Sequence, residues 1–338
     1  MNMYRLTAIL IVISVLAASC GKPTVPESLF DEKNGGGYKF VSKTPTAGYA
    51  QDIVKKGDLV YLAQGEGGLM IFNIANPQKP VIISKATNEV RGYSSKIAIK
   101  DTVVYLATGS FGVTALDVSA PEKPRITAPT LSMKPAKSIH VFGDFMFTAI
   151  SEQGIKIADI SYATQPDIRG KTNTQGYAQS IDVTNDTAFM LVACGEMGLS
   201  VFNISNFDNG FGTYPLSALV ETPGFAEDIC IMDNKSIAFM ACGSAGLQIV
   251  DFSDTSNVRI LGSYYLAGYA KEVAYKNQRV YMTSEKAGLQ IIDVTDLKKP
   301  SLVGYLVTGF ALGVDVDDDF VYVADEDDGL VIISIPEY

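Results

Sequence analysis

The sequence contains no tryptophan, a single histidine and four cysteines among its 338 residues. These scarcities remove many of the side chains that proteins use for catalysis and metal binding. The one histidine lies in the alternating segment Ile139-His140-Val141, where a packed or channel-lining role is more common than that of a general base. No Gly-x-Ser-x-Gly motif is present. Nucleophilic catalysis therefore has little support, whereas a pair of carboxylates needs only spatial proximity and stays open.

Positive charge is also scarce, because 27 lysines and arginines stand against 37 aspartates and glutamates. The formal net charge of −10 produces a surface that repels nucleic acid and anionic lipid headgroups. Neither is therefore a predicted partner.

The N-terminal apolar stretch, Leu6 to Val15, is too short to span a bilayer. It follows the positively charged Arg5 and ends in small residues, which is typical of a secretory signal. The segment Ala17-Ala18-Ser19-Cys20 resembles the lipobox of bacterial lipoproteins, with the preferred leucine, Leu16, one place further upstream than usual.

From this N-terminus we predict a signal peptide over residues 1–19 and a lipidated tether over residues 20–37, attached through Cys20. The expected location is the bacterial cell envelope, with the lipid anchor as the membrane contact. Display on the periplasmic or on the surface side stays open. An ordinary secretory signal with an unmodified Cys20 is the alternative.

The other three cysteines, Cys194, Cys230 and Cys242, lie within apolar segments. Their odd number and their strand-interior setting predict buried free thiols rather than a disulfide, even for an exported chain.

The chain repeats itself seven times, with a period of about 42 to 48 residues. Each unit begins with a phrase such as Gly268-Tyr269-Ala270 and continues to a phrase such as Gly288-Leu289-Gln290-Ile291-Ile292-Asp293. A repeat of this length that is built from short strands and turns predicts a propeller.

The sixth unit shows how one repeat forms one blade. Four short apolar runs are separated by Gly, Asn, Asp and Pro, which predicts four antiparallel strands over 270–275, 280–283, 289–294 and 301–305. The third strand is apolar on both faces, as in Leu330-Val331-Ile332-Ile333. A strand with two apolar faces has to lie between two neighbours, as blades do in a propeller.

The seventh unit ends after its third strand, while Tyr38-Lys39-Phe40-Val41-Ser42-Lys43 resembles a fourth strand. We therefore predict an all-β fold over residues 38–338. It is a seven-bladed β-propeller of four-stranded antiparallel blades, in which the N-terminal strand completes the last blade and closes the ring.

The phrase Asp117-Val118-Ser119-Ala120-Pro121-Glu122-Lys123-Pro124, together with Gly-Leu-x-Ile-x-Asp, resembles the LVIVD-repeat proteins. The resemblance covers about residues 38–336. It implies a β-propeller and an extracytoplasmic address, but no common activity. Two departures from the pattern are Lys134-Pro135-Ala136 in the third unit and a longer loop, Asn206 to Pro215, in the fourth.

Two sets of residues are expected to meet on one face of the propeller. The first is an aromatic column: Tyr49, Tyr93, Tyr177, Phe225, Tyr269 and Phe310. The second is a set of acidic loop residues: Glu66, Glu152, Glu196, Glu285 and Asp325. Aromatic rings beside carboxylates suit sugars or peptide segments. The favoured alternative is that the rings only pack between blades, because a repeated residue usually serves repeated packing.

Three further sets of residues are interpreted as structural or as weak candidates for a site. The residues Asp52, Lys96, Ser138, Ser180, Asp228, Glu272 and Gly313 are expected to line the central channel, with pairing such as Lys96 to Asp52. The polar residues that end each third strand are expected to cap the next turn. Asp325, Asp327 and Asp328 are weak calcium candidates, because they lack a specific loop spacing. No metal or cofactor is therefore expected.

The sequence predicts a non-catalytic, monomeric binding or scaffold module for an envelope protein or a glycan. The alternative is an envelope polysaccharide hydrolase or lyase that uses acidic residues at the channel mouth.

Overall fold

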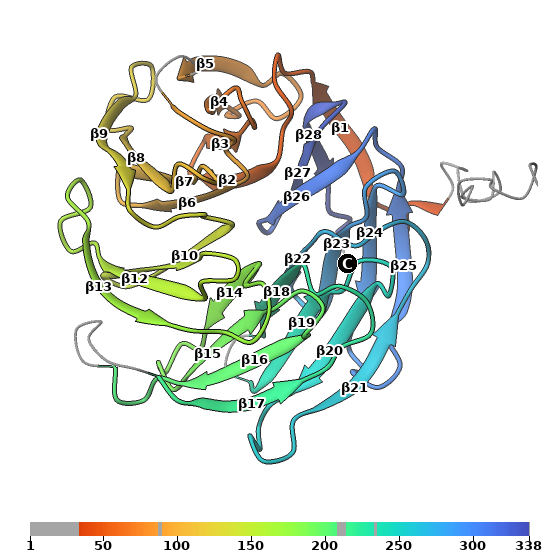
Figure 1. Ribbon diagram of the computed structural model, residues 1–338. Coiled ribbons are helices and arrows are strands. Elements are labelled where there is room, and N and C mark those ends of the chain that lie inside the picture. Colours follow the sequence, from red (N-terminus) through yellow and green to blue (C-terminus); the bar gives the residue numbers. More distant parts are fainter. Residues whose placement is uncertain (1–33, 87–89, 208–213, 233–234, 338) are drawn as a thin grey trace, which may run out of the picture. The chain divides into compact units, whose positions relative to one another are not determined.

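The computed structural model describes residues 34–337 except 87–89, 208–213 and 233–234. Within these residues, strands β1 to β28 form seven separate four-stranded antiparallel sheets, which are arranged as blades around a central axis (Figure 1). The predicted seven-bladed propeller is confirmed. The predicted signal peptide, Cys20 and the first part of the predicted tether lie outside the described residues. The described chain contains no helix long and apolar enough to cross a membrane.

The first four blades follow one another along the chain. Blade 1 contains β2 (Asp52–Lys56), β3 (Leu59–Ala63), β4 (Leu69–Asn73) and β5 (Val81–Ala86). Blade 2 contains β6 (Lys96–Lys100), β7 (Val103–Ala107), β8 (Val113–Asp117) and β9 (Arg125–Leu131). Blade 3 contains β10 (Ser138–Phe142), β11 (Phe145–Ala149), β12 (Ile155–Asp159) and β13 (Asp167–Thr172). Blade 4 contains β14 (Ser180–Val183), β15 (Phe189–Ala193), β16 (Leu199–Asn203) and β17 (Leu216–Val220).

The last three blades complete the ring. Blade 5 contains β18 (Asp228–Ile231), β19 (Ile237–Ala241), β20 (Leu247–Asp251) and β21 (Arg259–Tyr264). Blade 6 contains β22 (Glu272–Lys276), β23 (Arg279–Thr283), β24 (Leu289–Asp293) and β25 (Ser301–Leu306), each within two residues of its predicted bounds. Blade 7 contains β26 (Ala311–Val316), β27 (Phe320–Asp325), β28 (Gly329–Ser334) and the N-terminal β1 (Lys39–Thr44).

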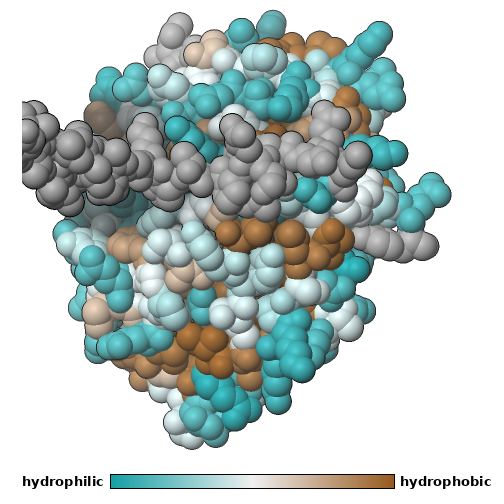
Figure 2. All heavy atoms as spheres, turned by 90° about the vertical axis from the view of Figure 1, so that its right-hand side faces the viewer, coloured by the Kyte–Doolittle hydropathy of each residue, from teal (hydrophilic) through white to brown (hydrophobic). Residues whose placement is uncertain are grey.

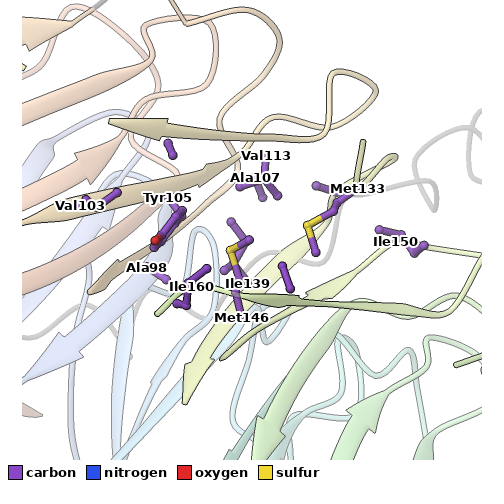
Figure 3. Close-up of a cluster of buried hydrophobic side chains, with 13 residues drawn as sticks. Ala98, Val103, Tyr105, Ala107, Val113, Met133, Ile139, Met146, Ile150 and Ile160 are labelled. Atoms are coloured by element: carbon purple, nitrogen blue, oxygen red, sulfur yellow. The ribbon is translucent and has the colours of Figure 1, made fainter. Parts of the chain in front are cut away.

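The core is divided among the interfaces between blades, and each of the seven interfaces holds one cluster of buried hydrophobic side chains. Leu69 and Ile71 of β4 pack toward blade 2, whereas Met70 and Phe72 of the same strand pack toward blade 7. Figure 3 shows the cluster between blades 2 and 3. Full burial of such a side chain stabilises the fold by about 1.5–3 kcal/mol. The two apolar faces of the third strand are therefore used as predicted.

The ring is closed by β1, which pairs with β28 from Lys39–Ser334 to Thr44–Leu330. Tyr38, directly before β1, is buried, and its hydroxyl lies 3.2 Å from that of Tyr281 in blade 6. Figure 2 shows the side of the molecule that lies at the right of Figure 1, where hydrophobic side chains form small groups between hydrophilic ones. The predicted closure is confirmed.

Two local predictions about turns are also confirmed. The glycine before each third strand has a positive φ in all seven blades, for example +90° at Gly112 and +84° at Gly154. The polar residue that ends the strand caps the following turn: Asp117 Oδ1 accepts the N–H of Ser119 at 2.9 Å.

The two departures from the repeat have different structural outcomes. The Lys134–Pro135 peptide bond is cis, and Ala136 still pairs with Gly109 of blade 2. The inserted loop of blade 4 is described only at its ends. There, the rings of Phe207 and Tyr214 stack with centroids 5.7 Å apart, and Phe207 also packs edge-on against Phe145 of blade 3.

We expect a chain that lacks residues 1–44 to lose at least about 3 kcal/mol of unfolding free energy, because it loses buried Tyr38 and exposes the edge of β28. It should also associate, since an unpaired strand edge is a template for pairing. Urea unfolding and light scattering measure both effects. A chain that lacks only residues 1–33 is the control and should stay monomeric. Equal stability of the two chains would show that β1 is dispensable.

Candidate functional site

The propeller has two ends, one of which carries the predicted aromatic column. We call the end where each innermost strand begins the aromatic face, and the other end the opposite face. On the aromatic face, the side chains of Tyr49, Tyr93 and Tyr177 are 57%, 42% and 44% exposed. Phe225, Tyr269 and Phe310 are half-buried. The column therefore presents aromatic surface to solvent around the mouth of the channel.

Three of the aromatic rings, those of Tyr93, Phe225 and Tyr269, rest on a loop of the preceding blade. The loop between the second and third strands forms an isolated β-bridge with the next blade, as Gly65 does with Ser94. A Cβ on Gly65 would lie 2.8 Å from Cε2 of Tyr93, and one on Gly243 would lie 2.6 Å from Cζ of Tyr269. The rings thus pack between blades through one edge and stay accessible elsewhere, so packing and binding are compatible.

The predicted acidic residues occupy different environments. Glu66, Glu152 and Glu196 lie at exposed loop tips, and Glu285 is half-buried. Asp325 is completely buried, and its carboxylate accepts the backbone N–H groups of Phe310, Asp327 and Asp328 at 2.8–3.0 Å.

The assignment of Asp325 to a binding face is therefore wrong, because the carboxylate is occupied in shaping its own loop. Asp328 accepts the N–H of Gly309 and pairs with Lys43 at 2.8 Å. Within the described residues, no group of three or more His, Cys, Asp or Glu side chains is arranged to hold a metal ion.

Six of the seven residues predicted at the start of the innermost strands line the channel, and Gly313 does not. Lys96 Nζ lies 3.8 Å from Asp52 Oδ1 and contacts Glu272 Oε2 directly. The predicted pairing of Lys96 with Asp52 is confirmed. Asp228, Ser138 and Ser180 complete the polar lining at this level of a channel of about 370 Å³.

Buried carboxylates in the channel connect consecutive blades. Each accepts a backbone N–H from the innermost strand of the next blade, as Asp52 does from Ile97 at 2.8 Å and Asp228 from Val273 at 3.0 Å. Asp182 accepts the N–H of Ile231 and Asp315 that of Lys55, both at 2.7 Å. Since the Asp315 bond joins blade 7 to blade 1, these bonds also support the closed ring.

Burial determines the titration of these groups. It raises the pKa of Asp52 and of Glu272, and the positive charge of Lys96 opposes the rise. Burial alone would lower the pKa of Lys96, but the charges of Asp52 and Glu272 raise it. Burial also raises the pKa of Asp182 and Asp315, while their backbone N–H donors oppose the rise.

A second cavity, of about 680 Å³, opens at the opposite face and was missed from the sequence. It is lined by blades 3 to 5 and by Tyr275 of blade 6. His140 lies in its wall with Nδ1 3.5 Å from Asp182 Oδ1, and it also lines the channel, which is one of the two roles predicted for it. Asp182 lies two residues after Ser180 in β14, so the two side chains point to the same face of that strand.

Cys194 and Cys242 are buried thiols outside any disulfide, as predicted, whereas Cys230 is half-buried rather than buried. Burial raises the pKa of Cys194 to about 11 and that of Cys242 to about 12, so both remain thiols at neutral pH. Their role is hydrophobic packing between blades.

These features define the protein as a closed β-propeller with a polar channel and exposed aromatic rings on one face. The family model for the LVIVD repeat matches residues 47–87, 135–174, 223–265, 267–308 and 308–336, which is more than half of the chain. The protein belongs to the LVIVD-repeat family. Blades 2 and 4 have the same four strands without a match of their own.

Similar solved structures are propellers at low sequence identity. The WD40 β-propeller domain of Doa1 has a TM-score of 0.70 at 11% identity, covering 89% of this chain and 98% of that chain. The computationally designed Ika8 protein has a TM-score of 0.61 at 9% identity, covering 85% and 83%. Such identities show the fold alone. Among curated proteins, none matches the chain.

Replacement of Lys96 by Met should remove about 3–5 kcal/mol of unfolding free energy at pH 7.5, because Asp52, Asp228 and Glu272 lose their shared cation. Without Lys96, the pKa values of Asp52 and Glu272 rise further in the folded state. A carboxyl group whose pKa is raised by folding contributes stability below its unfolded pKa, and this contribution is lost as the pH rises through its folded pKa. The difference in unfolding free energy between the wild type and Lys96→Met should therefore shrink as the pH is lowered toward about 4.5.

Urea unfolding at several pH values measures this effect. Lys276→Met is the matched control, because Lys276 pairs with Asp318, whose side chain is 81% exposed. It should change stability by less than about 1 kcal/mol at every pH. An equal, pH-independent loss in both variants would contradict the electrostatic role of Lys96.

Proposed function

We propose that this protein is a non-catalytic binding or scaffold module that is anchored to the bacterial cell envelope by a lipid on Cys20. Its aromatic face takes a protein partner or a glycan. The observation that carries this proposal is the set of partly exposed aromatic rings around the channel mouth, three of which pack on loops of the preceding blades. Rigid aromatic surface is enriched at binding sites, because it gives contact area at low entropic cost.

The runner-up is a polysaccharide hydrolase or lyase. One observation favours it: Asp52 and Glu272 share Lys96 in the channel, and a raised carboxyl pKa suits a general acid. Against it, Asp52 binds the N–H groups of Ile53 and Ile97 and so already has a structural role. Turnover of an envelope polysaccharide that is lost in Glu272→Gln would replace the binding proposal with this one.

A crosslinked pull-down from the native envelope tests the binding face. The variant Tyr49→Ala, Tyr177→Ala, Tyr269→Ala should lose the captured partner or glycan by at least about tenfold, since truncation of a central aromatic contact often costs that much affinity. Circular dichroism and thermal unfolding establish that the variant is folded.

Tyr162→Ala is the matched control, because Tyr162 is 78% exposed in a turn of the opposite face. It should keep the partner. Capture that is equal in the wild type and the triple variant would restrict the aromatic column to packing and make a substrate screen the next step.

The lipid anchor is tested separately. Cys20→Ser should move the mature protein from the membrane fraction to the soluble fraction, or leave it as an uncleaved precursor, because the acylated thiol is missing. Fractionation with incorporation of a labelled fatty acid measures this. Membrane association and labelling that persist in Cys20→Ser would exclude lipidation at this residue.

A further inference from the structure

Charge is distributed unevenly around the aromatic face. From blade 6 through blade 7 to blade 2, acidic loop residues lie beside aromatic rings, and we call this set the acidic–aromatic arc: Glu285, Phe310, Glu326, Tyr49, Glu66 and Tyr93. In blade 3, by contrast, Pro135 replaces the aromatic residue, and its neighbours Lys134 and Lys137 are exposed. The arc is therefore a distinct part of the aromatic face.

Two of the acids occupy a loop position at which other blades have glycine. Gly65, Gly195 and Gly243 support the rings of Tyr93, Phe225 and Tyr269. In blades 6 and 7 the same position is Glu285 and Glu326. Glu285 exchanges two backbone hydrogen bonds of 3.0 Å with Ala311, directly after Phe310, and the N–H of Glu326 donates to Phe310 O at 2.9 Å. The backbone of Glu285 is thus fixed beside the residue that follows Phe310, and that of Glu326 beside Phe310 of its own blade.

The members of the arc are close enough to affect one another. Burial raises the pKa of Tyr93, and the charges of Glu326 and Glu66 raise it further. Burial likewise raises the pKa of Glu285, Lys271 opposes the rise, and Glu227 and Glu326 add to it. Glu326 therefore acts on both ends of the arc, which forms one continuous electrostatic environment.

Next to the arc, the protein contains the same arrangement with its own cation. Lys271 Nζ lies 5.4 Å from the ring centroid of Tyr269 and 3.1 Å from Glu227 Oε1. This is a cation held between an aromatic face and a carboxylate. At the position of Lys271, blades 1 and 2 have the neutral Gln51 and Ser95.

Within the arc, Glu285 already lies near cations, because the charges of Lys271 and Lys286 oppose the rise of its pKa. Within the described part of the chain, no salt bridge reaches Glu66, Glu285 or Glu326. Two members offer ring surface, since Tyr49 and Tyr93 are 57% and 42% exposed, and Phe111 beside Gly92 is 44% exposed. The rings of Tyr49 and Tyr93 and the carboxylates of Glu66 and Glu326 are thus available to a partner that brings the positive charge.

We propose that the acidic–aromatic arc binds a basic peptide segment of a partner protein, whose Lys or Arg side chains lie against Tyr49 and Tyr93 and face Glu66 and Glu326. This inference rests on the proposed use of the aromatic face for binding. A neutral glycan would use the rings but leave the carboxylates uncompensated, and an anionic polymer would be repelled. Charge complementarity therefore selects a cationic peptide.

An array of synthetic decapeptides of random sequence, incubated with the labelled full-length protein in detergent, tests the inference. The bound peptides should be enriched in Lys and Arg by at least about twofold over the array. Binding of these peptides should fall by about tenfold in the variant Glu66→Gln, Glu326→Gln, and also in the wild type when salt is raised from about 50 to about 500 mM.

Glu122→Gln is the matched control, because Glu122 is exposed in a turn of the opposite face. It should bind the same peptides within about twofold. In Glu66→Lys, Glu326→Lys the enrichment should change from basic to acidic peptides. This reversal keeps the test decisive even if the neutral variant loses binding for another reason.

Three results would overturn the inference. The first is no enrichment of Lys and Arg among the bound peptides, and the second is no effect of the glutamate substitutions on peptide binding. The third is measurable binding of maltoheptaose that is equal in the wild type and in the variant Glu66→Gln, Glu326→Gln. The aromatic face would still be a binding face if the pull-down partner is lost in the triple tyrosine variant. Failure of both experiments would remove the proposed function as well.

Discussion

The structure depends on burying both faces of the third strand of every blade. A sheet with one apolar face can be covered by one neighbour, but Leu69 and Ile71 of β4 need blade 2, while Met70 and Phe72 need blade 7. Every blade therefore requires a blade on each side. A row of blades meets this requirement at its two ends only if it closes, which explains why the first strand of the chain completes the last sheet.

Closure also determines the chemistry of the molecule. It places seven innermost strands around one axis, where their polar side chains face a narrow channel. Most of this polarity stabilises the ring itself: Asp52, Asp182 and Asp315 each bind a backbone N–H of the next blade. Exposed aromatic surface is left on the aromatic face, where the rings of Tyr93, Phe225 and Tyr269 pack on the blade before them. Scaffold and candidate site are thus produced by the same repeat.

The fold was predictable from the sequence because one pattern occurs seven times, and even the closing strand could be recognised from its resemblance to other fourth strands. Most site residues could be placed on the correct face for the same reason. Asp325 could not, because a run of four acids resembles a solvated loop, whereas its carboxylate is buried against backbone N–H groups. The contact of His140 with Asp182 depends on the adjacency of blades 3 and 4 around the channel. The partly exposed state of Tyr93 depends on Gly65 of another blade.

The pairing of β1 with β28 has a consequence for how the chain is made. Synthesis proceeds from the N-terminus, so residues 39–44 emerge long before their partner strand at residues 329–334. During this interval β1 has no strand to pair with, and the growing row of blades has two open ends. The final contact also joins residues separated by almost the whole chain, which is the slowest kind of contact to form. Acquisition of the native state is therefore a terminal event in biosynthesis, and a truncated nascent chain cannot reach it.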